Sequence, residues 1–253
     1  MEKRIIGIIS GKGGVGKTTT VVNLSAALME FNKNVIAIDA DLKMSGLGLQ
    51  LGMYYFPFTL NDVLMDKGKL FEALYIHPSG LRIIPASLYS KDIKFYHLKN
   101  VLEDPFLDNN IVLVDAPPGL ESNAMAVLKS CPEILIVTTP EIPSITDAMK
   151  IMTAARKTKN KILGIIVNMY KKREYNQINV KEIESSCCLP IIGTVPYDKN
   201  IKKGLFRRVP GVFLNPYASS SVAYKKIAAS IMGHEYKPPG NRFLKKFFKR
   251  FKK

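Results

Sequence analysis

The chain has 253 residues, of which 47% are hydrophobic, and this is enough apolar content for one globular α/β domain. No run approaches the ~20 apolar residues of a membrane-spanning helix, and the three cysteines (Cys131, Cys187 and Cys188) have no metal-ligand spacing. We therefore expect reduced thiols and a cytoplasmic protein, and the net charge of +16 predicts an anionic partner.

Predicted strands and helices alternate along the chain. Short runs rich in Ile and Val predict strands at 4–10, 34–39, 81–86, 110–115, 133–139, 161–168 and 190–195. Helix-length segments lie between them at about 16–31, 59–64, 68–75, 120–130, 143–158, 178–187 and 217–232. Strands that are apolar on both faces are typical of a parallel sheet covered by helices on both sides. We expect a doubly wound, mostly parallel α/β fold that binds its ligand at the carboxyl ends of the strands.

The first predicted strand leads into a phosphate-binding pattern, G-x-x-x-x-G-K-[ST], formed by Gly11, Lys12, Gly13, Gly14, Val15, Gly16, Lys17 and Thr18. In this pattern backbone N–H groups wrap a phosphate chain, the lysine reaches the terminal phosphates and the hydroxyl ligates Mg²⁺. The helix that follows, from Thr19, adds unpaired N–H groups and a favourable dipole. The sequence therefore predicts a nucleotide site over residues 11–19.

A second lysine, Lys12, lies inside this loop, where the general pattern requires no charge. It is close to the loop's own phosphates and can also reach those of a neighbouring subunit. The loop resembles that of the MinD/ParA family of ATPases, which reads K-G-G-x-G-K-[ST], and the likeness extends over residues 4 to about 232. The resemblance implies an ATP-sandwich homodimer in which Lys12 acts on the partner's ATP, Lys17 binds the phosphates of its own subunit, and Thr18 ligates Mg²⁺.

The second predicted strand ends at Asp39 and is followed by Asp41, at the same edge of the sheet as the phosphate loop. Two carboxylates there can orient Mg²⁺-bound water and the attacking water. In the family this stretch is switch I. The resemblance implies that Asp41 positions the nucleophilic water and that Asp39 belongs to the Mg²⁺ shell.

Another apolar strand ends at Asp115 and is followed by Ala116-Pro117-Pro118-Gly119. An acid at this place holds Mg²⁺ through water in other P-loop enzymes. About 100 residues after a matching phosphate loop, this motif predicts the Walker B strand and switch II, with Asp115 as a metal residue and Gly119 as a pivot.

Two later stretches are candidates for adenine recognition. Asn168 ends a strand with an amide whose donor and acceptor can pair with the base. Pro196 and Asp198 lie where the resemblance implies a loop against the base. A plain turn role remains open for both stretches.

The last residues form a separate basic segment. We expect the domain to cover 1–236, a linker 237–241 with two prolines and a glycine, and a helix 242–253. On a helical wheel its large apolar side chains fall in an arc of roughly 140° that excludes every Lys and Arg; they are Phe243, Leu244, Phe247, Phe248 and Phe251. A basic helix with an aromatic face is suited to anionic lipid, although a partner groove, core packing or nucleic acid stays open.

These features predict an ATPase that uses ATP/ADP and Mg²⁺, dimerises with ATP, and lies peripherally on the cytoplasmic face of the membrane. There it would position division or other cell-surface machinery under a stimulating partner protein, as MinD-type members do. The alternative is a ParA-type partition ATPase that contacts DNA through basic clusters at 171–173 and 202–208. A third group, the iron–sulfur scaffold ATPases, shares Pro-Pro-Gly after the Walker B aspartate but has a C-x-x-C arrangement that this chain lacks.

Overall fold

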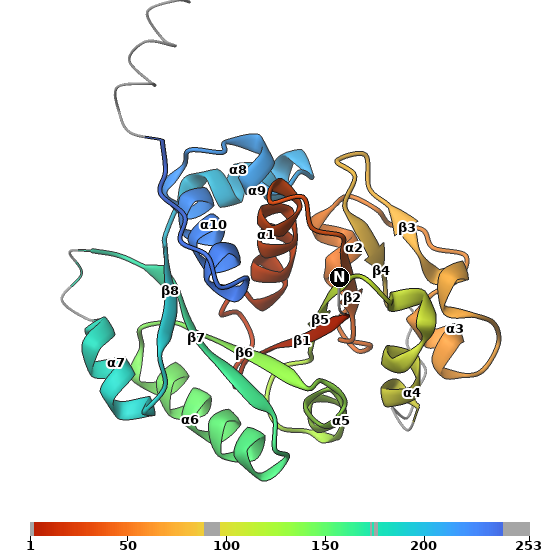
Figure 1. Cartoon of the computed structure of the whole chain (residues 1–253), viewed down its shortest axis with the longest axis horizontal. Helices are drawn as coiled ribbons and strands as arrows, with labels where there is room; N and C mark the ends of the chain where they lie inside the picture. The colour runs from red at the N-terminus through yellow and green to blue at the C-terminus, as the bar shows by residue number, and fades with distance from the viewer. Residues whose placement is uncertain (1–2, 89–96, 173, 175–176, 240–253) are drawn as a thin grey trace, which may run out of the picture.

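A computed structural model of the chain describes residues 3–88, 97–172, 174 and 177–239. The predicted helix at 242–253 lies outside the described residues. The described part is built on an eight-stranded sheet of order β3-β4-β2-β5-β1-β6-β7-β8 (Figure 1). The strands are β1 (Arg4–Ile9), β2 (Val35–Asp39), β3 (Tyr75–Ile76), β4 (Arg82–Ile84), β5 (Ile111–Asp115), β6 (Glu133–Thr138), β7 (Lys161–Tyr170) and β8 (Ile191–Pro196).

All neighbouring strands are parallel except the short antiparallel pair β3–β4. The predicted mostly parallel α/β fold is thus confirmed. The larger helices are α1 (Lys17–Glu30), α3 (Leu60–Leu64), α4 (Leu98–Glu103), α5 (Ser122–Ser130), α6 (Ile142–Lys157), α7 (Val180–Cys187), α8 (Lys199–Arg207) and α10 (Ser219–Ile231). Shorter turns are α2 (Leu47–Gln50), α9 (Gly211–Leu214) and the 3₁₀ helices η1 (Leu70–Ala73) and η2 (Pro105–Leu107). None of the helices in the described ranges is long and apolar enough to cross a membrane.

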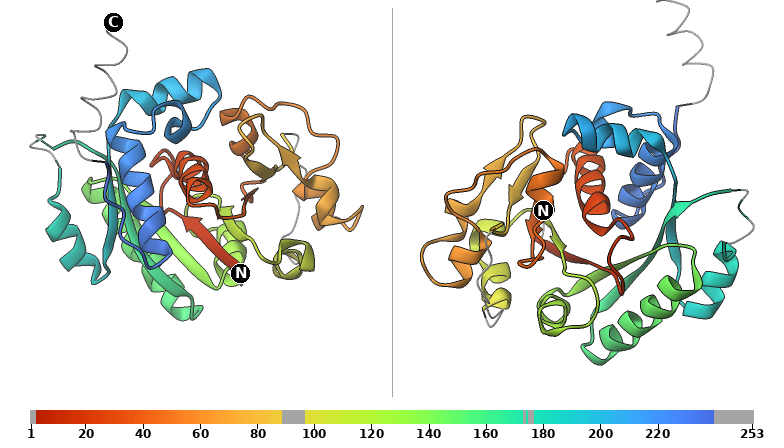
Figure 2. Two further views of the ribbon diagram at one scale, coloured as in Figure 1. Left: turned by 45° about the horizontal axis from the view of Figure 1, so that its top comes forward. Right: turned by 180° about the vertical axis from the view of Figure 1, so that it is seen from behind.

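The strands alternate their side chains between two apolar layers, as the period of two requires. Ile6 and Ile8 of β1 point into a core made with α1, α2, α9 and α10. Ile5 and Ile9 point the other way, into a core made with α3 to α7. Figure 2 shows the sheet between these two helical layers. Covering both faces explains why the strands are apolar throughout.

The strand order places the candidate site at a reversal in the sheet. β1 lies between β5 and β6, while β2 lies on the far side of β5. The chain therefore leaves β1 through the phosphate loop beside the ends of β2 and β5. Asp39 and Asp115 occupy the same register position on neighbouring strands. Ligands of open parallel sheets bind at such a switch point.

Candidate nucleotide-binding site

The phosphate loop is held open by glycine geometry. Gly14 and Gly16 have φ values of +81° and +85°, in the region that side chains rarely adopt. Gly16 ends the loop in this conformation, and α1 begins at Lys17. A Cβ atom on Gly16 would also collide with the Asn168 amide. The loop's backbone N–H groups thus meet the N-terminus of α1, where anions bind.

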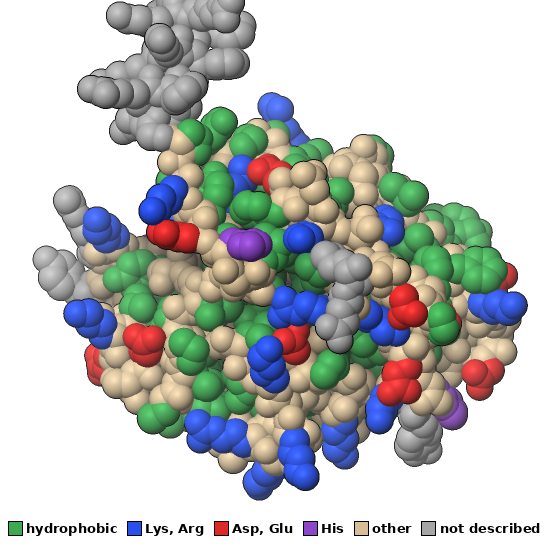
Figure 3. Space-filling model, in the orientation of Figure 1, with side chains coloured by type: hydrophobic (Ala, Val, Ile, Leu, Met, Phe, Trp, Pro, Cys, Tyr) green, Lys and Arg blue, Asp and Glu red, His purple; other side chains and the backbone are tan. Residues whose placement is uncertain are grey.

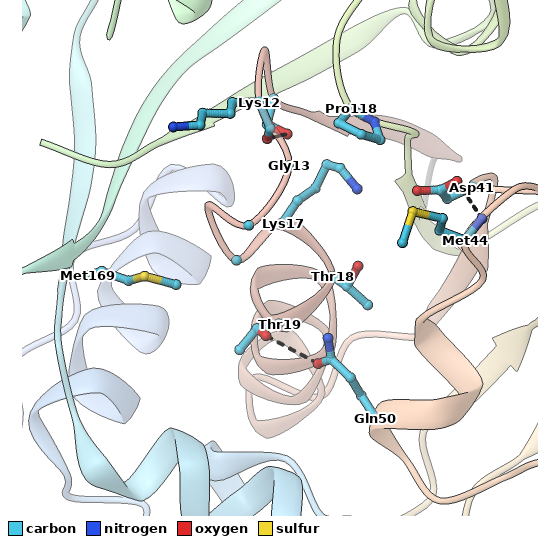
Figure 4. A pocket seen from close by; sticks show the side chains of 13 residues that line it. Lys12, Gly13, Lys17, Thr18, Thr19, Asp41, Met44, Gln50, Pro118 and Met169 are labelled. Carbon is cyan, nitrogen blue, oxygen red and sulfur yellow. Dashed lines mark hydrogen bonds between the residues drawn. The ribbon is translucent and has the colours of Figure 1, made fainter. Parts of the chain in front are cut away.

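A cavity of about 380 Å³ lies over this loop (Figure 4). Of the residues predicted from sequence, it is lined by Lys12, Gly13, Gly14, Gly16, Lys17, Thr18, Thr19 and Asp41. Ser10, Met44, Gln50, Pro118 and Met169 also line it. Its size suits a small ligand, and its polar groups come from the loop and α1 on one side and from Asp41 and Gln50 on the other.

Lys17 reaches across the sheet edge to the end of β5. Its Nζ lies 2.8 Å from Asp115 Oδ1, and the side chains are 8% and 0% exposed. Burial raises the pKa of Asp115, and the ammonium of Lys17 opposes that rise without cancelling it. Removing either partner of such a buried ion pair destabilises the protein, because the remaining charge is left uncompensated.

Asp39 holds switch I in place. Its Oδ1 accepts from the Asp41 N–H, and its Oδ2 accepts from the Ser45 hydroxyl and from the N–H groups of Gly46 and Leu47. Burial and the nearby charge of Asp115 raise the pKa of Asp39 to about 7. Asp39 therefore anchors the turn that carries Asp41, and its membership of the Mg²⁺ shell stays a prediction.

The donors at this edge fit a hard divalent cation. Asp115 Oδ2 is buried without a hydrogen-bond partner among the described residues, and an orphaned buried carboxylate oxygen is costly. The Thr18 hydroxyl lines the adjoining cavity and stabilises the Asp115 carboxylate. Mg²⁺ prefers such oxygen ligands. Thr18 and Asp115 are the residues that would hold it, and it would supply charge neutralisation to the phosphates.

The two lysines of the loop point in different directions. Lys17 turns toward Asp115, whereas Lys12 extends away from Lys17 (Figure 4). Lys12 is exposed and has no ion pair within the ranges that the structure describes. Gly11 lets this part of the loop pass close to α6, since a Cβ there would lie 2.5 Å from the Asp147 Cβ.

Switch II connects directly to the loop. Gly119, with φ of +82°, donates its N–H to the Ser10 carbonyl at 2.9 Å. The exposed pair Lys43–Glu121 joins switch I to switch II at 3.4 Å. Movement of switch II would therefore disturb its contact with the start of the phosphate loop.

The predicted adenine residues lie outside the cavity lining. The Asn168 Nδ2 donates to the Val15 carbonyl at 2.8 Å and is part of the loop's support. Pro196 ends β8. Asp198 caps α8 through the Asn200 N–H and also accepts from Ser219 and Ser220 at the start of α10. Their base-recognition roles stay predictions.

Replacing Asp198 with Ala is expected to lower the free energy of unfolding by about 1–2 kcal/mol, because α8 loses its cap and its link to α10. Burial alone would raise the pKa of Asp198, but hydrogen bonds from Asn200, Ser220 and Ser219 bring it down to about 2. The depressed pKa contributes stability above pH ~4 that is lost as pH falls toward 2. In urea unfolding, the difference in the free energy of unfolding between wild type and Asp198→Ala should shrink by about 1 kcal/mol from pH 6 to pH 3. A difference that stayed constant would contradict a contribution from the charge of Asp198.

Sequence reasoning missed the cavity's Gln50 and Met169. Gln50 ends α2, and its Oε1 accepts from the Thr19 hydroxyl at 3.2 Å. Met169 has φ of +57° and follows Asn168 at the end of β7. Neither belongs to a motif, and only the fold brings them to the loop. For Met169, the one signal in the sequence was its position directly after Asn168, which was a candidate for adenine recognition.

The comparisons agree with this geometry. Residues 6–210 match the CobQ/CobB/MinD/ParA nucleotide binding domain. An uncharacterised ATP-binding protein of Methanocaldococcus jannaschii is 36% identical over 251 residues, 96% of this chain and 95% of that protein. The septum site-determining protein MinD of Synechocystis is 32% identical over 92% of this chain and 90% of its own length. The structure of MinD from Pyrococcus horikoshii complexed with Mg-ADP has a TM-score of 0.85 and 34% identity, covering 90% of this chain and 95% of that one.

Proposed function

Because the chain belongs to the CobQ/CobB/MinD/ParA nucleotide-binding family, we propose that it is an ATPase of the MinD type that cycles between a free and a membrane-bound form. The chain's reaction is the hydrolysis of ATP to ADP and phosphate with Mg²⁺. Lys17, Thr18 and the loop N–H groups bind the nucleotide in this proposal. Asp41 positions the attacking water.

The observation that carries dimerisation is the course of Lys12, which lines the same cavity as Lys17 but points away from it. A cation that points away from its own Walker B acid is free to meet phosphates presented by a second copy. The exposed apolar side chain of Met44 (78%) lines the same cavity, and Ile142 at the start of α6 is 70% exposed. Burying such side chains favours association. ATP bound between two copies would join these surfaces.

Membrane attachment rests on the segment 242–253. It carries seven basic residues and no acid, with five large apolar residues. One such helix is only marginally stable in water. On a membrane, the free energy gained from its lipid contacts barely exceeds the cost of ordering the chain, so a single tail binds weakly. Two tails on an ATP dimer gain ~10²–10⁴ in avidity. Attachment to the cytoplasmic face would then follow the nucleotide state, and the protein would position cell-surface machinery under control of a stimulating partner.

The ParA-type alternative is supported by the basic clusters at 171–173 and 202–208. Non-specific DNA binding needs a basic surface and strong salt dependence. On the face in Figure 3 as a whole, however, Lys and Arg side chains are mixed with Asp and Glu and do not form one extended basic surface. The segment 242–253, which combines basic with large apolar residues, favours binding to lipid over binding to DNA.

Co-sedimentation with vesicles tests the proposal. With vesicles of 40 mol% phosphatidylglycerol in phosphatidylcholine, the bound fraction should be at least about tenfold higher with ATP than with ADP. A chain ending at Gly240, and the full chain with Phe247→Glu and Phe251→Glu, should stay in the supernatant. ATP-independent binding, or binding that survives both changes, would contradict the proposal. ATP-dependent, salt-sensitive DNA binding in its place would establish the alternative.

Replacing Asp41 with Ala is expected to slow hydrolysis by about 10²–10⁴ while ATP affinity stays within a few-fold, so the protein accumulates as an ATP-bound dimer. The Asp41 Oδ1 accepts a hydrogen bond from the Met44 N–H at 3.0 Å. Asp41→Asn is the matched control, because its amide oxygen can still accept this bond, and it separates loss of the carboxylate from loss of the turn. Single-turnover hydrolysis and sedimentation velocity give the two readouts. If Asp41→Ala turned over at the normal rate, the role of Asp41 would be wrong.

A further inference from the structure

A basic and aromatic surface on α8 has no part in the nucleotide site. Residues 199–218 include five basic residues and no acid. Phe206 is 89% exposed and lies among Lys203 and Arg207 at the rim of a second cavity of about 570 Å³, between α8 and α9. Apolar Leu214 lines the same cavity. We call this the α8 surface.

The α8 surface is rigidly built. Asp198 caps the helix and ties it to α10, as described above. Gly204 is buried on the inner side, where a Cβ would lie 2.8 Å from the Val209 carbonyl oxygen. Lys202 lies over the Tyr197 ring, 5.5 Å from its centroid. The exposure of Phe206 therefore comes from a fixed helix facing outward, and such a side chain is costly to leave in water.

The chain's last described residues pass close to this surface. The ring of Tyr236 packs edge-on against Phe31, with centroids 5.8 Å apart. Glu30, next to Phe31 in the chain, pairs with Lys225 of α10 at 2.6 Å, and Lys225 lies over the ring of Tyr217, 5.8 Å from its centroid. Asn215, two residues before Tyr217, hydrogen-bonds Asn200 of α8 at 3.5 Å. The described part of the chain thus ends, at residue 239, on the side of the molecule that carries α8 (Figures 1 and 2).

The occupant must be anionic and must accept an apolar side chain. The chain's own C-terminal segment does not fit, because its seven basic residues would face five more. Duplex DNA satisfies the charge but offers no place for a protruding phenyl ring on its phosphates. An anionic bilayer satisfies both, since lysines contact headgroups while aromatic rings enter the interface. In Figure 3 hydrophobic and basic side chains lie together along the upper edge, over α8 and α9.

We propose that the α8 surface is a second lipid contact, with Phe206 entering the headgroup region and Lys203 and Arg207 binding anionic headgroups. This proposal rests on the membrane attachment proposed above and names the part of the folded domain that faces the lipid. Two points of contact per subunit fix the orientation of the domain, which a tail alone leaves free.

The test compares the full-length wild type with Phe206→Ala/Lys203→Glu, using ATP and the phosphatidylglycerol vesicles described above. The double variant should need about tenfold more lipid for half-maximal binding, with ATP-dependent dimerisation unchanged. Its matched control, Phe71→Ala/Lys157→Glu, removes an exposed phenyl group and reverses a charge on the layer that covers the opposite face of the sheet. The control should bind as the wild type does.

Each outcome is informative. If wild type and the α8 variant bound lipid equally, the α8 proposal would be overturned and the membrane function would stand. A wild type that bound no lipid would overturn both. An equal loss for the control variant would show a general charge effect and overturn the α8 contact, as would a variant that lost DNA binding in place of lipid binding.

Discussion

Lys17→Ala is expected to lower ATP affinity by at least about 100-fold and, separately, to destabilise the nucleotide-free protein by about 3 kcal/mol. The affinity falls because the loop loses the ammonium that reaches the phosphates. The stability falls because Asp115 is fully buried and loses the only ion pair that the described residues give it. Titration with a fluorescent ATP analogue measures the first effect, and urea unfolding without nucleotide measures the second.

The double variant Lys17→Ala/Asp115→Asn separates the two roles. Removing both charges leaves no buried ion unpaired, so most of the lost stability should return, while ATP affinity should stay low. If the single variant kept full stability, the pair would not contribute to folding. If the double variant regained ATP affinity, Lys17 would not be the phosphate lysine.

The sheet and the phosphate loop were predictable from sequence because their signals are local. Runs of Ile and Val mark strands that are buried on both faces, and the predicted helix at 16–31 is α1, Lys17–Glu30. The predicted helix at 68–75 was wrong in part, because the structure has only the short 3₁₀ helix η1 (Leu70–Ala73) followed by β3 (Tyr75–Ile76), and a two-residue strand carries no periodicity. α8 was missed as well, because its many basic residues and Gly204 do not show a clear helical pattern. The helix is fixed instead by its Asp198 cap and by packing against Val209.

The candidate site shows the same division. The motifs identified Lys17 and Asp115 separately, but their ion pair joins residues 98 apart in sequence, and only the strand order brings them together. Asn168 was a candidate for binding the base, yet its amide donates a hydrogen bond to the carbonyl of Val15, 153 residues earlier in the chain. Asp39 was predicted at the metal, and the structure adds four hydrogen bonds to switch I. Motifs predict residue types at a strand end, whereas partners depend on the tertiary fold.

Lys12→Ala is expected to raise the dissociation constant of the ATP-bound dimer at least about 100-fold, equal to ~2.7 kcal/mol. In the proposed dimer the two copies would bring clustered phosphate charge into one interface, and Lys12 would neutralise it across the subunits. Since Lys12 is exposed and has no ion pair among the described residues, stability should change by no more than about 0.5 kcal/mol. ATP affinity of the monomer should stay within about threefold, because Lys17 remains.

The measurement is best made on the Asp41→Ala background, where the expected slowing of hydrolysis would keep ATP in the site. Sedimentation velocity with ATP and Mg²⁺ should then show a dimer for Asp41→Ala and a monomer for Lys12→Ala/Asp41→Ala. Lys129→Ala/Asp41→Ala is the matched control, because Lys129 lies in the last turn of α5 and its loss changes the net charge equally. If the Lys12 variant dimerised as the control does, the lysine would act only within its own subunit. The folded domain would then need another cation to bridge the two nucleotides, and the orientation of Lys12 in Figure 4 would have no functional consequence.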